Sequence, residues 1–337
     1  MRILITGGAG FVGSQLGVHL ARLGHEVLLL DNMRYGHVDN LIHEGRPYGR
    51  FIGRDVRDAG IARFFDGVDA VVHLAGIAAL PDCQKDPVEA YDVNVGGTAN
   101  VLECARRAGV RRFIFSSTSA IYENTTSERQ REDDPVQPDL VYSMTKHAAE
   151  QLCTAAARNY GLDIITCRFF NLYGPHQDFL RTSPPFTSYV ARELALGRKP
   201  VLFNDSPAAR RDYVYIDDLL ALLVRMLESP STYHGNIFNV GSGTAYSVPE
   251  IFGVLQQVAG SDVTPEYQDP EQYWNAHPAL FEGPMSLSRA RIRKEVFKSS
   301  CADTTLTTTT FGWNPTVPLA EGLARVYAYS AARLRCS

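Results

Sequence analysis

The sequence lacks the features that mark membrane proteins, secreted proteins and nucleic-acid-binding proteins. No run of about 18 apolar residues occurs, so we expect no membrane-spanning helix. The chain opens on a strand-like run, Ile3–Ile5, without the charged start and long apolar stretch of a signal peptide, and we expect a cytoplasmic protein. Lysine and arginine number 33 against 37 aspartate and glutamate, which leaves a net charge of −4 and no basic field for a nucleic-acid partner.

Cysteine is scarce and scattered. The six cysteines form no Cys-x-x-Cys pair and show no spacing typical of metal ligands, so we expect no metal site. We interpret them as free thiols in a reducing compartment. They are Cys83, Cys104, Cys153, Cys167, Cys301 and Cys336.

Short apolar runs alternate with amphipathic stretches through the first half of the chain. This alternation indicates βαβ units and an α/β fold with a doubly wound parallel sheet, covered by helices on both faces. The expected strands are Arg2–Thr6, Glu26–Leu30, Gly49–Ile52, Ala70–Leu74, Arg112–Ser116 and Ile164–Phe169. The expected helices are Phe11–Leu23, Ala59–Phe65, Pro87–Ala108 and Asp139–Tyr160.

The pattern changes after about Gly174, where prolines become more frequent and irregular stretches lengthen. A helix is expected at Leu219–Leu227, whereas Ser261–Leu287 has no clean periodicity. We expect residues 1–174 to form the doubly wound domain and residues 175–337 to form mainly a smaller, mixed α/β substrate lobe. Whether some later segments return to the large sheet stays open.

A glycine-rich turn follows the first expected strand. Gly7, Gly10 and Gly13 allow a positive φ, a close approach of the backbone to a pyrophosphate, and close packing of the next helix on the strand. The helix that begins near Phe11 and Val12 offers unpaired N–H groups and the positive end of its dipole to phosphates. Strand, turn and helix in this order are the context that a dinucleotide site requires. We therefore predict that this turn holds NAD in a Rossmann-type domain.

Asp31 ends the second expected strand, where a carboxylate accepts hydrogen bonds from the adenosine ribose and repels a 2′-phosphate. NAD is therefore favoured over NADP, although Arg34 keeps NADP open. The alternative is that Asp31 only starts a turn with Asn32, which is itself a candidate NAD contact. Asp55 and Val56 follow the third expected strand and are candidates for the adenine edge, although an aspartate in such a loop is common.

Tyr142 and Lys146 lie four residues apart in an expected helix, so the phenol and the ammonium share one helical face. A nearby lysine cation together with an oxidised nicotinamide favours the phenolate. We therefore predict that the pKa of Tyr142 falls toward neutrality and that Tyr142 is a general base. The alternative is an aromatic packing residue beside a solvated lysine. The hydroxyl-rich run Phe115–Tyr122 ends a preceding strand at the edge where ligands bind, which favours the catalytic interpretation.

These motifs together resemble those of the extended short-chain dehydrogenase/reductases, in particular the branch of nucleotide-sugar epimerases and dehydratases. The resemblance covers nearly the whole chain. The motifs that carry it are Thr6–Gly13, Asp31-Asn32, His73–Gly76, Asn94–Thr98, Ser116–Tyr122, Tyr142 with Lys146, Arg168–Pro175, Arg211–Asp218 and Asn239–Gly243.

The resemblance implies roles for individual residues. Thr118 hydrogen-bonds the sugar O4 and relays its proton to Tyr142, and Lys146 also holds the nicotinamide ribose. Asn171 and Arg211 hold the substrate diphosphate, which suits the fork of a guanidinium. Further contacts to NAD are implied for Leu74, Ala75, Gly76, Asn94, Ser116, Tyr142 and Lys146, and further substrate contacts for Ser119, Ala120 and Tyr142.

A second phosphate clamp is implied at Arg293, because its spacing to Asp303 matches that of the family. The alternative interpretation is that Arg293 is one cation of the basic patch Arg289–Lys294.

Ser119 and Ala120 bear on the reaction. Similar 4,6-dehydratases have Asp-Glu at these positions, UDP-glucuronate decarboxylases have a glutamate at the second, and 3,5-epimerases have a cysteine there. The resemblance therefore implies C4 epimerisation of a nucleotide sugar, with a UDP-sugar as first choice, through a transient 4-keto sugar and with tightly bound NAD. A nucleotide-sugar 4-ketoreductase, a dehydratase-like enzyme and a non-catalytic NAD-binding protein stay open.

The sequence departs from its relatives at some places. Glu123 stands where many relatives have glycine, Asn204–Pro207 replaces a Gly-Asp-Gly segment, and the loop Gly76–Cys83 lacks the lysine of galactose-type epimerases. Nucleotide and sugar are therefore left undetermined. Helices Pro87–Ala108 and Asp139–Tyr160 are those that pair in dimers of similar proteins, so a homodimer is expected by analogy.

Overall fold

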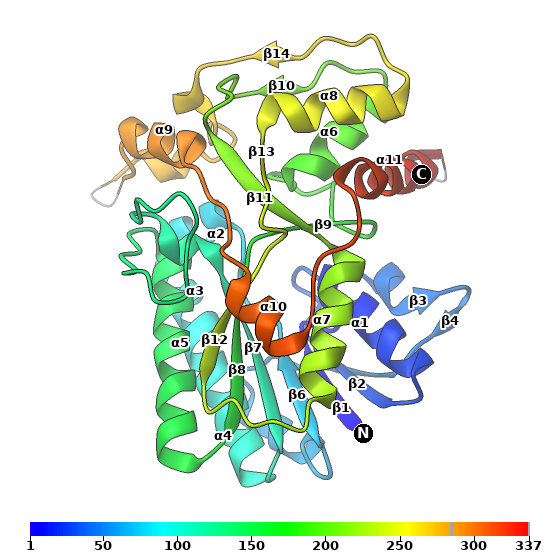
Figure 1. Cartoon of the computed structure of the whole chain (residues 1–337), viewed down its shortest axis with the longest axis vertical. Helices are drawn as coiled ribbons and strands as arrows, with labels where there is room; N and C mark the ends of the chain where they lie inside the picture. Colours follow the sequence, from blue (N-terminus) through cyan, green and yellow to red (C-terminus); the bar gives the residue numbers. More distant parts are fainter. Residues whose placement is uncertain (284–285, 336–337) are drawn as a thin grey trace.

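A seven-stranded sheet forms the centre of the computed structural model, which describes residues 1–283 and 286–335 (Figure 1). Its strands all run parallel, in the order β12-β8-β7-β6-β1-β2-β5. They are β1 (Arg2–Thr6), β2 (Glu26–Asp31), β5 (Arg50–Gly53), β6 (Ala70–His73), β7 (Arg112–Thr118), β8 (Asp163–Phe169) and β12 (Asn236–Val240). The strand order reverses between β1 and β6, and ligands bind at the carboxyl ends of strands at such a point. The predicted doubly wound α/β fold is confirmed.

Successive side chains of β1 face opposite hydrophobic layers. Ile3 and Ile5 pack with the helices of one face, Leu4 packs with those of the other, and all three are fully buried. Burial on both faces explains why the strands are continuous apolar runs. One face is covered by α1 (Phe11–Arg22) and α7 (Ile216–Glu228), and the other by α4 (Gly97–Arg107) and α5 (Val141–Tyr160).

The expected helix Pro87–Ala108 is present, but it is not a regular α-helix over its whole length. Helix α3 (Pro87–Tyr91) passes into a π-helical turn at Asp92–Gly96, and α4 follows it. Such turns widen a helix locally and occur often at functional sites. Asn94 lies in this turn, and its side-chain contacts, described below, explain the interruption. The stretch Ala59–Phe64 is a 3₁₀ helix rather than an α-helix.

The smaller lobe stands over the carboxyl ends of the large sheet, in the upper part of Figure 1. Its three-stranded sheet has the order β13-β11-β9, with β11 parallel to β9 and antiparallel to β13. Helices α6, α8 and α11 pack against one another, and β10 pairs with β14. The elements are β9 (Asn171–Tyr173), β10 (Val201–Leu202), β11 (Arg210–Tyr215), β13 (Ala245–Ser247), β14 (Glu266–Tyr267), α6 (Phe186–Ala195), α8 (Val248–Ala259), α9 (Arg289–Phe297) and α11 (Leu319–Arg335).

Three elements from beyond Gly174 lie with the large sheet: β12 pairs with β8, α7 packs on one face, and α10 (Thr305–Phe311) contacts β12. The remaining short elements are α2 (Leu80–Lys85), β3 (Ile42–His43), β4 (Arg46–Pro47), and the 3₁₀ helices Val38–Leu41, Ser119–Tyr122, Pro270–Gln272 and Pro278–Phe281. Within residues 1–283 and 286–335, no helix combines the length and apolarity needed to cross a lipid bilayer.

Candidate active site

A cavity of about 980 Å³ extends from the end of β1 to the smaller lobe. Its walls include the glycine turn, the ends of β6 and β7, one face of α5, and the lobe strands β9 and β11. The predicted site residues that line it are Gly7, Gly10, Phe11, Val12, Gly13, Asp31, Asn32, Val56, Leu74, Ala75, Gly76, Ser116, Thr118, Tyr142, Lys146, Asn171 and Arg211. The predicted site residues outside this lining are Asp55, Asn94, Ser119, Ala120 and Arg293.

The glycine turn makes room for a ligand at the start of α1. Gly7 has φ +71°, and a Cβ on Gly13 would lie 2.9 Å from the carbonyl carbon of Gly7. Both positions therefore require glycine. No side chain caps the helix at Gly10, so the first N–H groups of α1 face the cavity end without a side-chain acceptor. This arrangement fits a pyrophosphate.

Asp31 lies at the end of β2 with both carboxylate oxygens oriented by the backbone. Its Oδ2 accepts from the N–H of Ala9 at 3.0 Å, and its Oδ1 accepts from the N–H of Met33 at 2.8 Å. Each oxygen keeps a lone pair for a ribose hydroxyl. The guanidinium of Arg34, which also lines the cavity, is paired with Glu89. An arginine paired in this way is less available to a 2′-phosphate, which agrees with NAD.

Asp55 lies behind the cavity wall. Arg57 hydrogen-bonds the Asp55 carboxylate and, although burial opposes it, holds its pKa well below the usual range. Asn32 donates to the same carboxylate at 2.8 Å. Asp55 therefore braces Asn32, while its neighbour Val56 forms the cavity wall itself.

Asn94 is almost fully buried and braces the loop that follows β6. Its side-chain oxygen accepts from the N–H of Ile77 at 2.8 Å, and its Nδ2 donates to the Ile77 carbonyl at 3.1 Å and to Thr145 Oγ1 at 2.9 Å. The π-helical turn brings Asn94 between this loop and α5. Asn94 thus holds the main chain at Ile77, directly after Leu74–Gly76, and is not part of the cavity lining.

Tyr142, Lys146 and Thr118 meet in the middle of the cavity. The Lys146 Nζ donates to the Ser116 carbonyl oxygen at 2.6 Å, and the Thr118 hydroxyl is a neighbour of the Tyr142 phenol. Burial raises the pKa of Tyr142 to about 12, and the neighbouring Thr118 hydroxyl offsets only part of this effect. Burial also lowers the pKa of Lys146 to about 8. The residues of the chain by themselves therefore do not produce the predicted fall in the Tyr142 pKa. The removal of water around the phenol raises this pKa by more than the neighbouring residues lower it.

Asn171 and Arg211 come from paired strands of the smaller lobe. The Asn171 side chain donates to the Asp212 carbonyl at 3.0 Å, and Arg211 donates to the Glu295 carbonyl at 2.7 Å. Asp212 is fully buried and accepts from the N–H groups of Ser242, Gly243 and Ala302 at 2.7, 2.9 and 3.1 Å. The buried Asp212 thus fixes the strand while Arg211 faces the cavity.

Arg293 does not reach the cavity. Its side chain is 53% exposed, lies 4.0 Å from Asp269, and packs its guanidinium over the ring of Phe297. A different arginine, Arg181, lines the cavity and donates to the Ser183 carbonyl at 2.8 Å. Arg181 lies in an irregular segment, so its spacing gave no signal. Glu295 of α9 was also missed and lines the cavity.

Ser119 and Ala120 form the 3₁₀ turn directly after Thr118. The Thr118 Oγ1 accepts from the N–H of Ala120 at 3.1 Å, which starts the turn. Ser119 faces a separate, smaller pocket. The acidic residues that line the main cavity are Asp31, at the glycine-turn end, and Glu295, which is paired with Lys298 at 2.6 Å.

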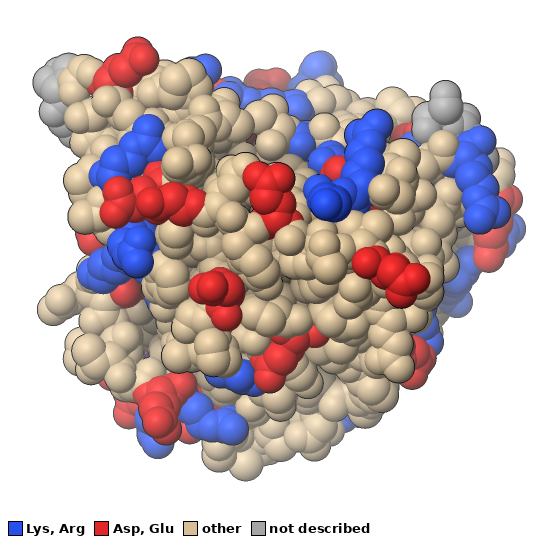
Figure 2. All heavy atoms as spheres, turned by 90° about the horizontal axis from the view of Figure 1, so that it is seen from above, with Lys and Arg blue, Asp and Glu red and all other residues tan. Residues whose placement is uncertain are grey.

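Figure 2 shows the molecule from the side of the smaller lobe. Acidic and basic side chains are scattered on this face among uncharged residues, and several of opposite sign lie side by side. In the smaller lobe, Arg210 of β11 and Glu250 of α8 pair at 2.8 Å. On this face the charges offer no stripe of one sign to a polyanion. Arg211 and Arg181 instead face the cavity.

The fold, the open helix start and the Tyr142–Lys146 pair define an α/β enzyme that uses a dinucleotide cofactor. The chain belongs to the NAD dependent epimerase/dehydratase family, whose model matches residues 3–241. NAD is therefore the cofactor, and the glycine turn and Asp31 are the residues that fit it.

Relatives in this family have more than one activity. The chain is 30% identical to UDP-glucose 4-epimerase of Streptomyces lividans over 331 residues, which cover 94% of the chain and 97% of the relative. It is 31% identical to dTDP-glucose 4,6-dehydratase of Streptomyces griseus over 335 residues, covering 97% and 93%. The crystal structure of UDP-glucose 4-epimerase from Thermotoga maritima with UDP-glucose is similar, with a TM-score of 0.86, 30% identity and coverage of 99% of this chain and 100% of that one.

Proposed function

We propose that the protein is a nucleotide-sugar 4-epimerase that retains its NAD. The observation that carries the proposal is the Thr118–Tyr142–Lys146 group, together with Ser119 and Ala120 directly after Thr118. Removal of water across C5–C6 needs an additional acid and base, and neither of these two residues supplies one. Epimerisation at C4 needs only one base for the O4 proton and a hydride carrier.

In this proposal Tyr142 takes the proton from the sugar O4, with Thr118 as relay. Because burial raises the pKa of Tyr142 to about 12, the phenolate needs positive charge beside it. Lys146, held on the Ser116 carbonyl, supplies one charge and is placed to hold the nicotinamide ribose. When bound, NAD would supply the second positive charge and the hydride-transfer chemistry at C4.

The diphosphate of the substrate is proposed to lie on Asn171 and Arg211, with Arg181 on the same cavity wall. A fork of guanidinium donors suits the two phosphates. An anchor at the diphosphate would leave the sugar free to present either face of C4 within the cavity. A UDP-sugar is the first choice of substrate, since similar proteins such as those of Streptomyces lividans and Thermotoga maritima are named for UDP-glucose.

The test is to incubate the purified protein with UDP-, dTDP-, CDP- and GDP-sugars in deuterium oxide and to follow the products by proton NMR. The expected result is a 4-epimer with no deuterium on carbon. Deuterium at C5 contradicts the proposal, because it indicates a dehydratase or a 3,5-epimerase. Stoichiometric oxidation of added NADH indicates a 4-ketoreductase, and NAD binding without turnover of any nucleotide sugar indicates a non-catalytic protein.

We also propose a cytoplasmic homodimer in which α4 and α5 of two copies pack together. The two helices contact each other on one outer face of the large sheet. Met144 of α5 is 40% exposed and Tyr160 at its end is 64% exposed, which leaves apolar surface for a partner. Light scattering after size-exclusion chromatography measures the mass, and the mass of one chain contradicts the proposed dimer.

A further inference from the structure

Glu123 is a buried carboxylate outside the cavity that holds the start of the helix carrying Tyr142. Its side chain is 1% exposed. Its Oε2 accepts from the N–H groups of Asp139 and Leu140 at 2.8 and 3.1 Å, and its Oε1 accepts from Ser143 Oγ at 2.7 Å. All three donors lie within four residues of Tyr142. A negative charge at a helix start also interacts favourably with the helix dipole.

Glu123 lies at the other end of a short turn from Thr118. The 3₁₀ helix Ser119–Tyr122 joins the two residues. The carboxylate therefore fixes the distance between two elements, the end of β7 with Thr118 and the first turn of α5 with Tyr142. These two residues must meet for proton transfer from a sugar hydroxyl.

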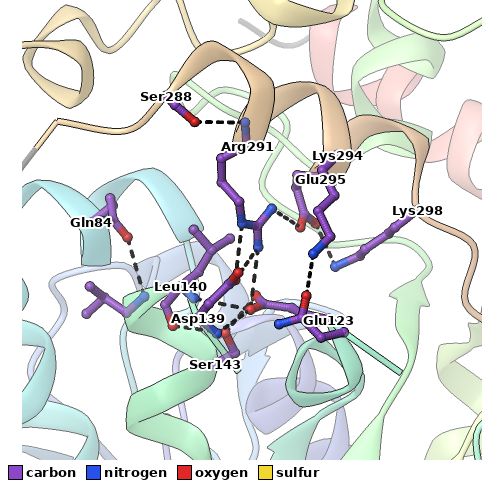
Figure 3. A network of polar contacts seen from close by, with 12 residues as sticks. Gln84, Glu123, Asp139, Leu140, Ser143, Ser288, Arg291, Lys294, Glu295 and Lys298 are labelled. Atoms are coloured by element: carbon purple, nitrogen blue, oxygen red, sulfur yellow. Dashed lines mark hydrogen bonds and ion pairs between the residues drawn. The ribbon is translucent and has the colours of Figure 1, made fainter. Parts of the chain in front are cut away.

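Arg291 of α9 ties a third element to the same point, as Figure 3 shows. Its guanidinium donates to Asp139 Oδ1 at 2.6 and 3.1 Å, and its Nη2 lies 3.5 Å from Glu123 Oε2. The Nη1 of Arg291 lies 3.4 Å from Oε2 of Glu295 in the same helix. The main-chain carbonyl of Glu295 accepts from Arg211 in the cavity. One chain of contacts therefore joins the proposed diphosphate anchor to the start of α5.

The charges around Glu123 come from several elements. Asp139 precedes α5, while Arg291, Glu295 and Lys298 come from α9 and the residue that follows it. Burial, together with the neighbouring Asp139 carboxyl, raises the pKa of Glu123 to about 7. Arg291 lies between the two carboxylates and compensates their mutual repulsion.

We propose that Glu123 is a positioning residue for Tyr142, and that Arg291 makes this positioning depend on α9. The inference rests on the proposed function in that Tyr142 is taken as the base. A displacement of about 1 Å in a reacting group can reduce a rate about 100-fold, so a carboxylate that touches no substrate can still control kcat.

The test compares Glu123→Ala, Glu123→Gln and Arg291→Met with the wild type, all purified with NAD bound. Glu250→Gln is the matched control, because Glu250 caps the start of α8 in a similar way and lies outside the cavity lining. For Glu123→Ala we expect kcat to fall at least about tenfold, with KM within about threefold. Glu123→Gln, which keeps an acceptor for the backbone N–H groups, recovers part of the loss. Arg291→Met lowers kcat less than Glu123→Ala.

A second measurement does not depend on the substrate. The phenolate absorbance of the NAD-loaded protein is titrated, and the curve of the corresponding Tyr142→Phe protein is subtracted to isolate Tyr142. We expect Glu123→Ala to move the Tyr142 midpoint by at least about half a pH unit, and Glu250→Gln to leave it in place. An unmoved midpoint together with unchanged kcat overturns the proposal. If the wild type converts no nucleotide sugar, the proposed function fails, while the titration still decides the role of Glu123.

Discussion

The Nζ of Lys146 lies 2.6 Å from the main-chain carbonyl oxygen of Ser116, and this hydrogen bond joins α5 to the end of β7. The lysine lies one helical turn after Tyr142 in α5, and its acceptor Ser116 stands two residues before Thr118 in β7. Since the acceptor is a main-chain atom, the lysine position depends on the strand and not on the identity of a neighbouring side chain.

Replacement of Tyr142 by phenylalanine removes the proposed base and keeps the ring that packs in the cavity. We expect kcat to fall by about 10²–10⁴-fold, the usual contribution of a positioned acid or base. NAD should remain bound, because the glycine turn and Asp31 are unchanged. Product formation by NMR and the absorbance of the bound cofactor measure the two effects. Full activity in this variant contradicts the assignment.

Burial of Lys146 predicts a pH dependence of stability. In the folded chain freed of NAD its pKa is lowered to about 8, so between about pH 8 and the ordinary lysine range the unfolded chain binds more protons. Stability contributed by this group therefore rises with pH across that interval. Lys146→Met should lose this rise. Urea unfolding of both proteins at about pH 7.5, below the interval, and at about pH 9.5, within it, measures the difference. Equal pH slopes in the two proteins would contradict it.

Replacement of Gly13 by alanine should abolish retention of NAD. The added Cβ would lie only 2.9 Å from the carbonyl carbon of Gly7, and closer still to its oxygen. The turn or α1 must shift, and the helix N–H groups then lose their orientation. The absorbance ratio of the purified protein and calorimetry with NAD report the loss. Gly253→Ala in α8 is the control: no atom lies near the added Cβ, so we expect retained NAD and stability raised by about 0.5–1 kcal/mol.

Replacement of Arg211 by methionine should raise KM about 10–100-fold, since one charged hydrogen-bonding partner of the diphosphate is lost. Arg210→Met is the control, because Arg210 pairs with Glu250 outside the cavity lining. Arg293→Met should raise KM less than Arg211→Met, because the Arg293 guanidinium lies over Phe297. Initial rates against substrate concentration decide this order, and a larger effect at position 293 would restore Arg293 as the clamp.

The large sheet and the NAD site could be predicted because their signals are local. Strands such as β1 are apolar on both faces, and the glycine turn needs its three glycines within seven residues. Tyr142 and Lys146 are four residues apart on one helix, so spacing alone places them on one face. The expected strand ends differ from the observed ones by at most two residues. The bounds of β1 (Arg2–Thr6) agree, whereas β5 (Arg50–Gly53) is shifted by one residue.

Other features depend on contacts between distant residues and could not be predicted. The π-helical turn follows from the contacts of Asn94 with Ile77 and Thr145. Arg181 faces the cavity from a segment without periodicity. The direction in which the pKa of Tyr142 shifts depends on how much water the fold removes around the phenol. The spacing of residues in the sequence carries no information on that quantity.

The hydrogen bond from Arg211 to the carbonyl of Glu295 has a consequence for variation at position 295. The acceptor is a main-chain carbonyl oxygen, so it is present whichever amino acid occupies position 295. Mutations there can therefore reshape the cavity wall while Arg211, the proposed anchor for the diphosphate, keeps its partner. The side chain that lines the cavity at position 295 is in this way free to vary independently of the contact that holds Arg211.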